Sequence, residues 1–266
     1  MIGDFIVGVD EVSVIGKLVD EVVAMVRGPE GEDVTITIYR PYENERFDVV
    51  ITRARVEIPL VHHEMHVLDE GRIGYIHIDG FDGRPSQGQF ISALEELMDE
   101  GMDGLILDLR NNSGGLLDVV NYITNMLIPE GVITFTENNR GERRYHYSTE
   151  GYLGLPLVLL VNGRSASASE VLSGAVRDTG VGTIIGERTF GKGVVNQVFP
   201  LSDESAVQLT IQKYFTPNGD TIHGIGVEPD IVIEMDPALS RMIGQLDLED
   251  DVQLQKALEV ITEKIR

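Results

Sequence analysis

Residues 157–176 have the sequence LVLLVNGRSASASEVLSGAV, in which an apolar run, a loop of small residues and a helix start follow one another. The apolar run at 157–161 favours a strand that is covered on both faces, as in a parallel sheet. The small residues at 165–169 allow a side chain and backbone N–H groups to approach a substrate closely. In an open α/β sheet, sites form beyond the carboxyl ends of strands, and this loop is therefore a candidate site.

Strands and helices alternate on both sides of this stretch. The expected elements, in chain order, cover residues 73–78, 90–98, 105–109, 116–127, 157–161, 169–176 and 183–185. Alternation of this kind implies right-handed βαβ units and a largely parallel sheet. Further strands at 207–214 and 231–234 and an amphipathic helix at 252–265 complete the predicted α/β core.

The first 41 residues predict a separate and smaller α+β segment. It contains an amphipathic helix at 18–26 and a strand at 34–38 in which apolar residues alternate with threonines. Two or three strands and one helix are few for an independent core. We expect residues 42–70 to connect this segment by strands to a core at 71–266 that ends in the C-terminal helix.

The composition excludes several classes of function. The chain of 266 residues has 21 Lys and Arg against 44 Asp and Glu, a formal net charge of −23 at pH 7. Such a chain repels phosphate backbones and anionic lipid, so we expect no nucleic-acid partner. Cysteine is absent, which excludes disulfides, thiolate nucleophiles and cysteine-bound metals.

Two further glycine-containing loops complement the serine-rich loop. The sequence RNNSGG at 110–115 follows a predicted strand, and GERTFGKG at 186–193 places Lys192 between two glycines. Lys192 comes 192 − 167 = 25 residues after Ser167, across one helix and one strand. A serine, a lysine and exposed backbone N–H groups at one sheet edge are the parts needed for acyl transfer.

Each part has a simpler interpretation when taken alone. Ser169 with Glu170 fits a helix-capping arrangement, with Ser167 an ordinary serine at the helix start. Lys192 fits a solvated lysine in a turn.

Two motifs resemble a phosphate-binding loop and a zinc site, but each lacks a residue or a spacing that such a site requires. The segment 186–193 has the outline of a phosphate loop, but Gly193 stands where a Ser or Thr should hold magnesium. His62, His63 and His66 occur in the order HHEMH within extended chain, where positions four apart are about 13 Å apart. We therefore expect neither a cofactor nor a bound metal.

Six ordered segments of the chain carry a family resemblance. They are GYIHIDGF, LILDLRNNSGG, NGRSASASEVLSGAVRDTG, IIGERTFGKGVVNQ, KYFTPNGDTIHGIGVEPDI and DVQLQKALEVI. Together they resemble the C-terminal processing peptidases, also called tail-specific proteases, from about Gly71 to the end. Residues 3–40 resemble the second half of that family's PDZ domain. The resemblance implies a clpP/crotonase-like α/β core with a mixed sheet, preceded by a partial PDZ-like α+β segment.

The resemblance also implies site residues. Members are serine proteases with a Ser–Lys dyad, and the matching positions here are Ser167 as nucleophile and Lys192 as base. The family's oxyanion donors correspond to the backbone N–H groups of Gly114 and Ala168.

One further position departs from the family pattern, and the role of another is left open. Where members often have a glutamine that orients the lysine, this chain has Asn196, with Gln197 next to it. A shift of one residue in a strand turns a side chain to the opposite face, so Asn196 is the better candidate for orienting the lysine. Asp178 matches an acid found in some members. It lies too far along one helix to touch the serine, and we interpret it as a helix-end or hydrogen-bonding residue.

The sequence thus predicts a serine endopeptidase that cleaves proteins near their C-termini. Two alternatives remain, a non-catalytic peptide-binding or scaffold protein on a degenerate protease core, and an inactive fragment of a longer protease. Protein or peptide substrates are the expected partners, and a homo-oligomer stays open. The family resemblance suggests a periplasmic or other extracytoplasmic location. The start MIGDFIVGVDE has no signal-peptide pattern, so a membrane anchor would require a segment upstream of Met1.

The PDZ resemblance leads to one expectation about substrates. The loop that binds a terminal carboxylate and the groove strand would precede Met1, whereas the groove-wall helix at 18–26 is present. We expect this segment to be loosely held, with its apolar face partly exposed unless a partner chain covers it. We also expect little discrimination between a free C-terminus and its amide.

Overall fold

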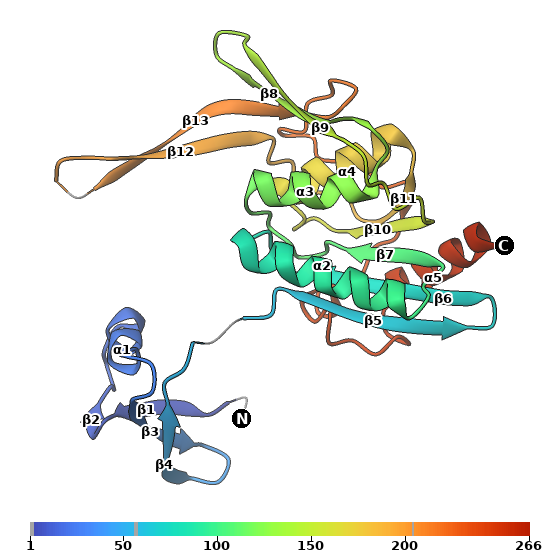
Figure 1. Cartoon of the computed structure of the whole chain (residues 1–266). Coiled ribbons are helices and arrows are strands. Elements are labelled where there is room, and N and C mark those ends of the chain that lie inside the picture. The colour runs from blue at the N-terminus through green and yellow to red at the C-terminus, as the bar shows by residue number, and fades with distance from the viewer. Residues whose placement is uncertain (1–2, 56–57, 204) are drawn as a thin grey trace. The chain divides into compact units, whose positions relative to one another are not determined.

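The computed structural model describes residues 3–55, 58–203 and 205–266, and the chain forms two compact units, Met1–Ile58 and Pro59–Arg266 (Figure 1). The boundary lies inside the segment 42–70 that we expected to connect the two parts. Strand β4 (Glu45–Thr52) pairs within the first unit, and strand β5 (Val61–Leu68) pairs within the second.

The first unit is a four-stranded antiparallel sheet with one helix. Its strand order is β2-β1-β3-β4, and its other elements are β1 (Phe5–Val9), β2 (Val12–Ser13), α1 (Val19–Val26) and β3 (Asp33–Arg40). The buried core is small and consists of Val9, Val14, Val34 and Ile36. No residue of α1 is fully buried, and Leu18 and Val19 at its start are 73% and 77% exposed. Val22, Met25 and Val26 of α1 pack against this core, so the apolar face of the helix is partly exposed, and the PDZ-like character of the segment stays a prediction.

The second unit contains a six-stranded sheet in the order β14-β11-β10-β7-β6-β5. Its remaining strands are β6 (Gly71–Ile78), β7 (Gly104–Asp108), β10 (Leu157–Val161), β11 (Gly182–Gly186) and β14 (Ile231–Val232). All neighbours are parallel except β5, which forms an antiparallel hairpin with β6. This confirms the predicted α/β fold with a mixed, largely parallel sheet.

Helices cover both faces of this sheet (Figure 1). One face packs against α2 (Gly83–Asp99), α3 (Leu117–Leu127) and α4 (Ala168–Thr179), and the other against the C-terminal helix α5 (Val252–Ile265). Successive residues of a strand point to opposite faces. Leu105 and Leu107 accordingly lie in the α2–α4 core, and Ile106 lies in the α5 core. Coverage on both faces explains why β10 and the stretch Leu105–Leu107 of β7 are uninterrupted apolar runs.

A second, antiparallel sheet has the order β12-β13-β8-β9. Its strands are β8 (Gly131–Asn138), β9 (Arg143–Ser148), β12 (Val194–Pro200) and β13 (Ala206–Phe215). The hairpin of β12 and β13 is long and has a register shift between Val195 and Asn196 (Figure 1). Strand β12 begins two residues after Lys192, so this hairpin continues directly from the lysine loop.

Candidate active site

The loop at 110–115 follows β7 and contacts the residues around Ser167. Gly114 has a φ of 106°, and a Cβ atom there would lie 2.7 Å from the carbonyl oxygen of Ala166 and 2.8 Å from Cβ of Ser167. Only glycine fits such a close approach at a positive φ. The predicted oxyanion loop and the predicted nucleophile are thus neighbours in space, 53 residues apart in sequence (167 − 114 = 53).

Ser167 precedes the first turn of α4 in an unusual backbone conformation. Its φ of 57° and ψ of −112° lie outside the common regions for a residue with a side chain. Two hydrogen bonds hold this turn to the glycine loop, from Ala166 N–H and from Ser169 Oγ to the carbonyl oxygen of Asn112, at 3.0 and 2.9 Å. The neighbours of Ser167 therefore fix a backbone conformation that would be strained in isolation.

Glu170, in the first turn of α4, is completely buried and joins the serine segment to the lysine segment. Its Oε2 accepts hydrogen bonds from the backbone N–H groups of Ser167 and Lys192, at 2.9 and 2.7 Å. Its Oε1 accepts from Gly191 N–H and Thr189 Oγ, both at 2.6 Å. The bond to Ser167 is one half of a capping box, which the sequence interpretation captured in part. No sequence signal pointed to the bonds with 189–192.

Lys192 is exposed and borders a surface depression of about 400 Å³. The depression is also lined by Asn111 and Ser113 of the glycine loop, by Arg164 and Ala166, and by Phe190. The ring of Phe190 is 66% exposed and supplies an apolar surface beside the lysine. The depression thus combines parts of all three loops that the sequence singled out.

The two expected oxyanion donors differ in their hydrogen bonding. The Gly114 N–H donates to Oδ1 of Asn112 at 2.8 Å, and Asn112 is itself buried and donates from Nδ2 to Ile78. Within residues 3–55, 58–203 and 205–266, no group accepts a hydrogen bond from the Ala168 N–H. Ala168 N–H therefore has no acceptor among the described residues, whereas Gly114 N–H is engaged.

Asn196 and Asp178 occupy separate positions. Asn196 lies in β12 just past the register shift, and its Oδ1 accepts from Thr210 Oγ1 at 2.8 Å. In the described part of the chain, no hydrogen bond joins Asn196 to Lys192. Asp178, near the end of α4, accepts from the Arg177 guanidinium and from Asn218 N–H. The interpretation of Asp178 as a hydrogen-bonding residue near a helix end is confirmed.

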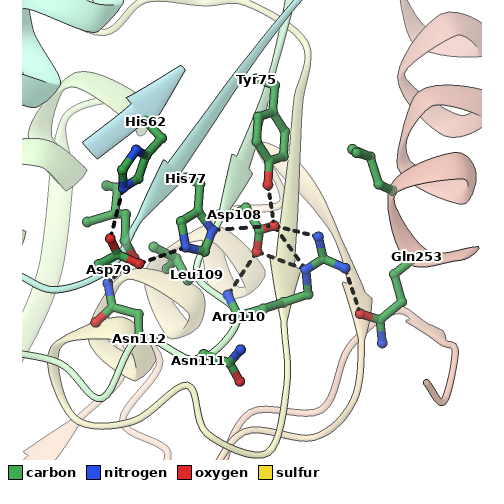
Figure 2. Close-up of polar contacts among 12 residues, drawn as sticks. His62, Tyr75, His77, Asp79, Asp108, Leu109, Arg110, Asn111, Asn112 and Gln253 are labelled. Atoms are coloured by element: carbon green, nitrogen blue, oxygen red, sulfur yellow. Dashed lines mark hydrogen bonds and ion pairs between the residues drawn. The ribbon is translucent and has the colours of Figure 1, made fainter. Parts of the chain in front are cut away.

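A buried ion network anchors the start of the glycine loop (Figure 2). Arg110 is fully buried and binds Asp108 with Nη2 at 2.6 Å and Asp251 with Nη1 and Nη2, both at 2.7 Å. Tyr75 donates its hydroxyl to Asp108 at 2.7 Å. Burial acts to raise the pKa of Asp108, but Arg110 and His77 outweigh it and hold that pKa well below its usual range. The network ties the ends of β6 and β7 to the beginning of α5, and no sequence pattern indicated it.

The three histidines of β5 face different carboxylates. His62 Nε2 lies 3.0 Å from Asp79, His63 Nε2 lies 3.0 Å from Glu96, and His66 Nε2 lies 3.1 Å from Glu64. Across residues 3–55, 58–203 and 205–266, no three His, Asp or Glu side chains converge as metal ligands would. No helix within the described residues has the length and apolarity that crossing a membrane requires.

Comparison with known proteins places the chain in a family. The model of peptidase family S41 matches residues 72–233. A carboxyl-terminal-processing protease of Synechocystis sp. is 36% identical over 261 residues, which cover 97% of this chain and 60% of that protein. A carboxy-terminal processing protease of Bacillus subtilis is 32% identical over 253 residues, covering 94% of this chain and 52% of that protein.

A solved structure shows the same fold. The photosystem II D1 C-terminal processing protease is 33% identical and superposes with a TM-score of 0.62, covering 87% of this chain and 63% of that chain. The present chain spans 60% or less of the length of the two curated relatives described above. The match to the family model and the similarity along nearly the whole chain show that this protein belongs to peptidase family S41, which includes the C-terminal processing proteases.

Proposed function

We propose that this protein is a serine endopeptidase that cleaves proteins near their C-termini with Ser167 and Lys192 as a catalytic dyad. The observation that supports the dyad most directly is the buried carboxylate of Glu170, which binds the backbone N–H groups of both residues. A single rigid group thereby relates the backbone of the nucleophile to that of the base. The preference for C-termini is taken from the names of the relatives.

In the proposed reaction, Ser167 Oγ attacks the carbonyl carbon of the scissile bond. The side-chain amine of Lys192 takes the hydroxyl proton and returns it to the leaving amine, which leaves an acyl-enzyme. Water then attacks the ester, with Lys192 again as the base, and releases the new C-terminus. The start of α4 adds a favourable dipole for the negative charge that develops beside Ser167.

The two proposed oxyanion donors differ in whether their N–H group is already hydrogen-bonded. The Ala168 N–H has no acceptor within the described residues and serves as the donor that is available at once. The Gly114 N–H must first turn away from Asn112 Oδ1 or share its hydrogen between two acceptors. We infer that binding of a substrate carbonyl shifts Gly114 into this role.

The proposed role of Asn196 is to orient Lys192 rather than to take part in the proton transfer. Its amide oxygen already accepts from Thr210, so a hydrogen bond from Lys192 would use its second lone pair. We expect Asn196→Ala to reduce kcat/KM by less than about ten-fold, an effect of positioning rather than of chemistry.

The test is hydrolysis of a peptide with an apolar, unstructured C-terminal tail. Ser167→Ala and Lys192→Ala are each expected to lower kcat about a thousand-fold or more, with an unchanged urea unfolding curve. Lys213→Ala is the matched control because Lys213 is also an exposed lysine, located in β13 outside the depression. Full activity in Lys192→Ala would contradict the dyad.

One observation favours a second candidate, a peptide-binding protein without catalysis. It is the hydrogen bond that engages the Gly114 N–H and leaves the oxyanion site incomplete. Binding of the same peptide by the wild-type chain, with no cleavage between pH 6 and pH 9, would support this candidate.

A further inference from the structure

A second depression, of about 240 Å³, lies beside the one that Lys192 borders. Arg164 lines both depressions, and the second is also lined by Asn162, Glu187, Met235, Ser240 and Arg241. Two arginines from distant parts of the chain therefore face one hollow next to the proposed dyad.

The loops that carry these arginines are fixed to the glycine loop. Oδ1 of the buried Asn162 accepts hydrogen bonds from the N–H groups of Asn111 and Arg164, both at 3.0 Å. Nδ2 of Asn162 donates to Oδ1 of Asn111, and Nδ2 of Asn111 donates to the carbonyl oxygen of Ser240 at 2.8 Å. The arginine backbones thus occupy set positions relative to the oxyanion loop.

The charge of this hollow opposes that of the molecule. The chain carries 44 acidic residues against 21 basic ones, yet neither Arg164 nor Arg241 forms a side-chain ion pair or hydrogen bond anywhere in the described chain. Glu187 also lines the hollow, but its Oε1 accepts from Met235 N–H at 3.2 Å and it makes no ion pair with either arginine. The residues that line the hollow thus carry two guanidinium groups and one carboxylate, a formal net charge of +1 (2 − 1 = +1).

We propose that Arg164 and Arg241 form a carboxylate-binding subsite for the substrate, adjacent to the Ser167–Lys192 site. The planar guanidinium fork matches a carboxylate in two parallel hydrogen bonds, which suits it to an Asp or Glu side chain or to a C-terminal carboxylate. This inference rests on the proposed function, because the ligand is a segment of the peptide that the dyad cleaves.

The test separates binding from cleavage by using the Ser167→Ala variant of the whole chain. Fluorescence anisotropy would compare three forms of one peptide with no charged side chains. The first has a C-terminal amide, the second has the amide and one Asp placed at successive positions, and the third has a free C-terminal carboxylate. We expect at least one of the two carboxylate-bearing forms to bind about three- to ten-fold more tightly than the amidated peptide without Asp. The form that does so identifies the source of the carboxylate.

Arginine variants assign the preference to the subsite. Arg164→Gln and Arg241→Gln, each added to Ser167→Ala, should weaken the preference, and the double variant should remove it. Arg140→Gln is the matched control, since it removes the same charge from an exposed arginine in the turn between β8 and β9. The preference should also shrink when salt is raised from about 0.05 M to about 0.5 M.

The outcomes distinguish this subsite from the proposed function. Equal binding of all peptide forms, or a preference that persists in the double variant, would overturn the subsite. A preference that depends on the two arginines, combined with no cleavage by the wild-type chain, would support the subsite and contradict the endopeptidase.

Discussion

Glu170 Oε2 accepts a hydrogen bond of 2.7 Å from the backbone N–H of Lys192, 22 residues further along the chain (192 − 170 = 22). The same oxygen accepts from Ser167, and the other oxygen accepts from Thr189 and Gly191. A buried carboxylate that accepts several hydrogen bonds holds its donors in one arrangement, because each donor that lost its acceptor would be left unsatisfied without water. The lysine loop is therefore held at the start of α4 by a glutamate that does not itself face the depression.

Replacing Glu170 by Gln is expected to lower the free energy of unfolding by about 2–4 kcal/mol. The amide keeps the size of the carboxylate but turns an N–H₂ group toward at least one backbone donor. Urea unfolding would measure the loss, and kcat should fall with it because the lysine loop is released. Glu263→Gln, in an exposed position of α5, is the control and should change stability by less than about 0.5 kcal/mol. Wild-type stability and activity in Glu170→Gln would contradict this role.

Gly114→Ala is expected to abolish hydrolysis. The new Cβ would meet Ala166 O at 2.7 Å and Ser167 Cβ at 2.8 Å, so the glycine loop and the serine turn must separate. The matched control is Gly101→Ala, since Gly101 also has a positive φ, 78°, but has open space around its added Cβ. That variant should lose only about 1–2 kcal/mol of stability from backbone strain and keep its activity. Equal activities in the two variants would show that the contact at Gly114 is unimportant.

Arg110→Ala is expected to destabilise the protein by about 3–5 kcal/mol. The change leaves the buried carboxylates of Asp108 and Asp251 without their cation, and this uncompensated charge is the source of the loss. Chemical unfolding would measure it. For comparison, Lys256→Ala breaks the pair with Glu259 on α5 and should cost about 0–0.5 kcal/mol. A similar, small effect in both variants would mean that the Arg110 network stabilises little.

The stability of the second unit is expected to fall as the pH rises through the pKa of His77. Burial lowers this pKa, but the negative charges of Asp108, 3.6 Å from Nδ1, and of Asp79, 3.1 Å from Nε2, outweigh burial and raise it above its ordinary value (Figure 2). A raised pKa in the folded state means that protonated His77 stabilises the fold. This contribution is complete below the unfolded value of about 6.5 and is lost as the pH rises through the folded pKa.

Urea unfolding of the wild type and of His77→Gln between about pH 5 and pH 9 would test this expectation. The difference between the two unfolding free energies should shrink as the pH rises. A difference that grows with pH would reverse the sign of the predicted shift, and an NMR titration of the His77 ring would report the pKa directly.

The sequence by itself determined the family, the α/β fold and most of the elements of the core. Uninterrupted apolar runs such as 157–161 identify strands that are covered on both faces, and α5 has the bounds expected from its amphipathic pattern, 252–265. Strands β8 and β9 were not expected. Their outer strand, β9, is mostly exposed and rich in Arg and Tyr, and such a strand has little hydrophobic alternation to detect.

Only the tertiary structure decided how the loops meet. From the sequence, Glu170 is one half of a helix cap, Arg110 is a polar residue after a strand, and Arg164 and Arg241 are unrelated. The fold makes Glu170 a four-bond acceptor, buries Arg110 between Asp108 and Asp251, and brings both other arginines to one hollow. The physical reason is that local patterns report which face of an element is apolar, whereas long-range hydrogen bonds and ion pairs depend on which loops the sheet order brings together.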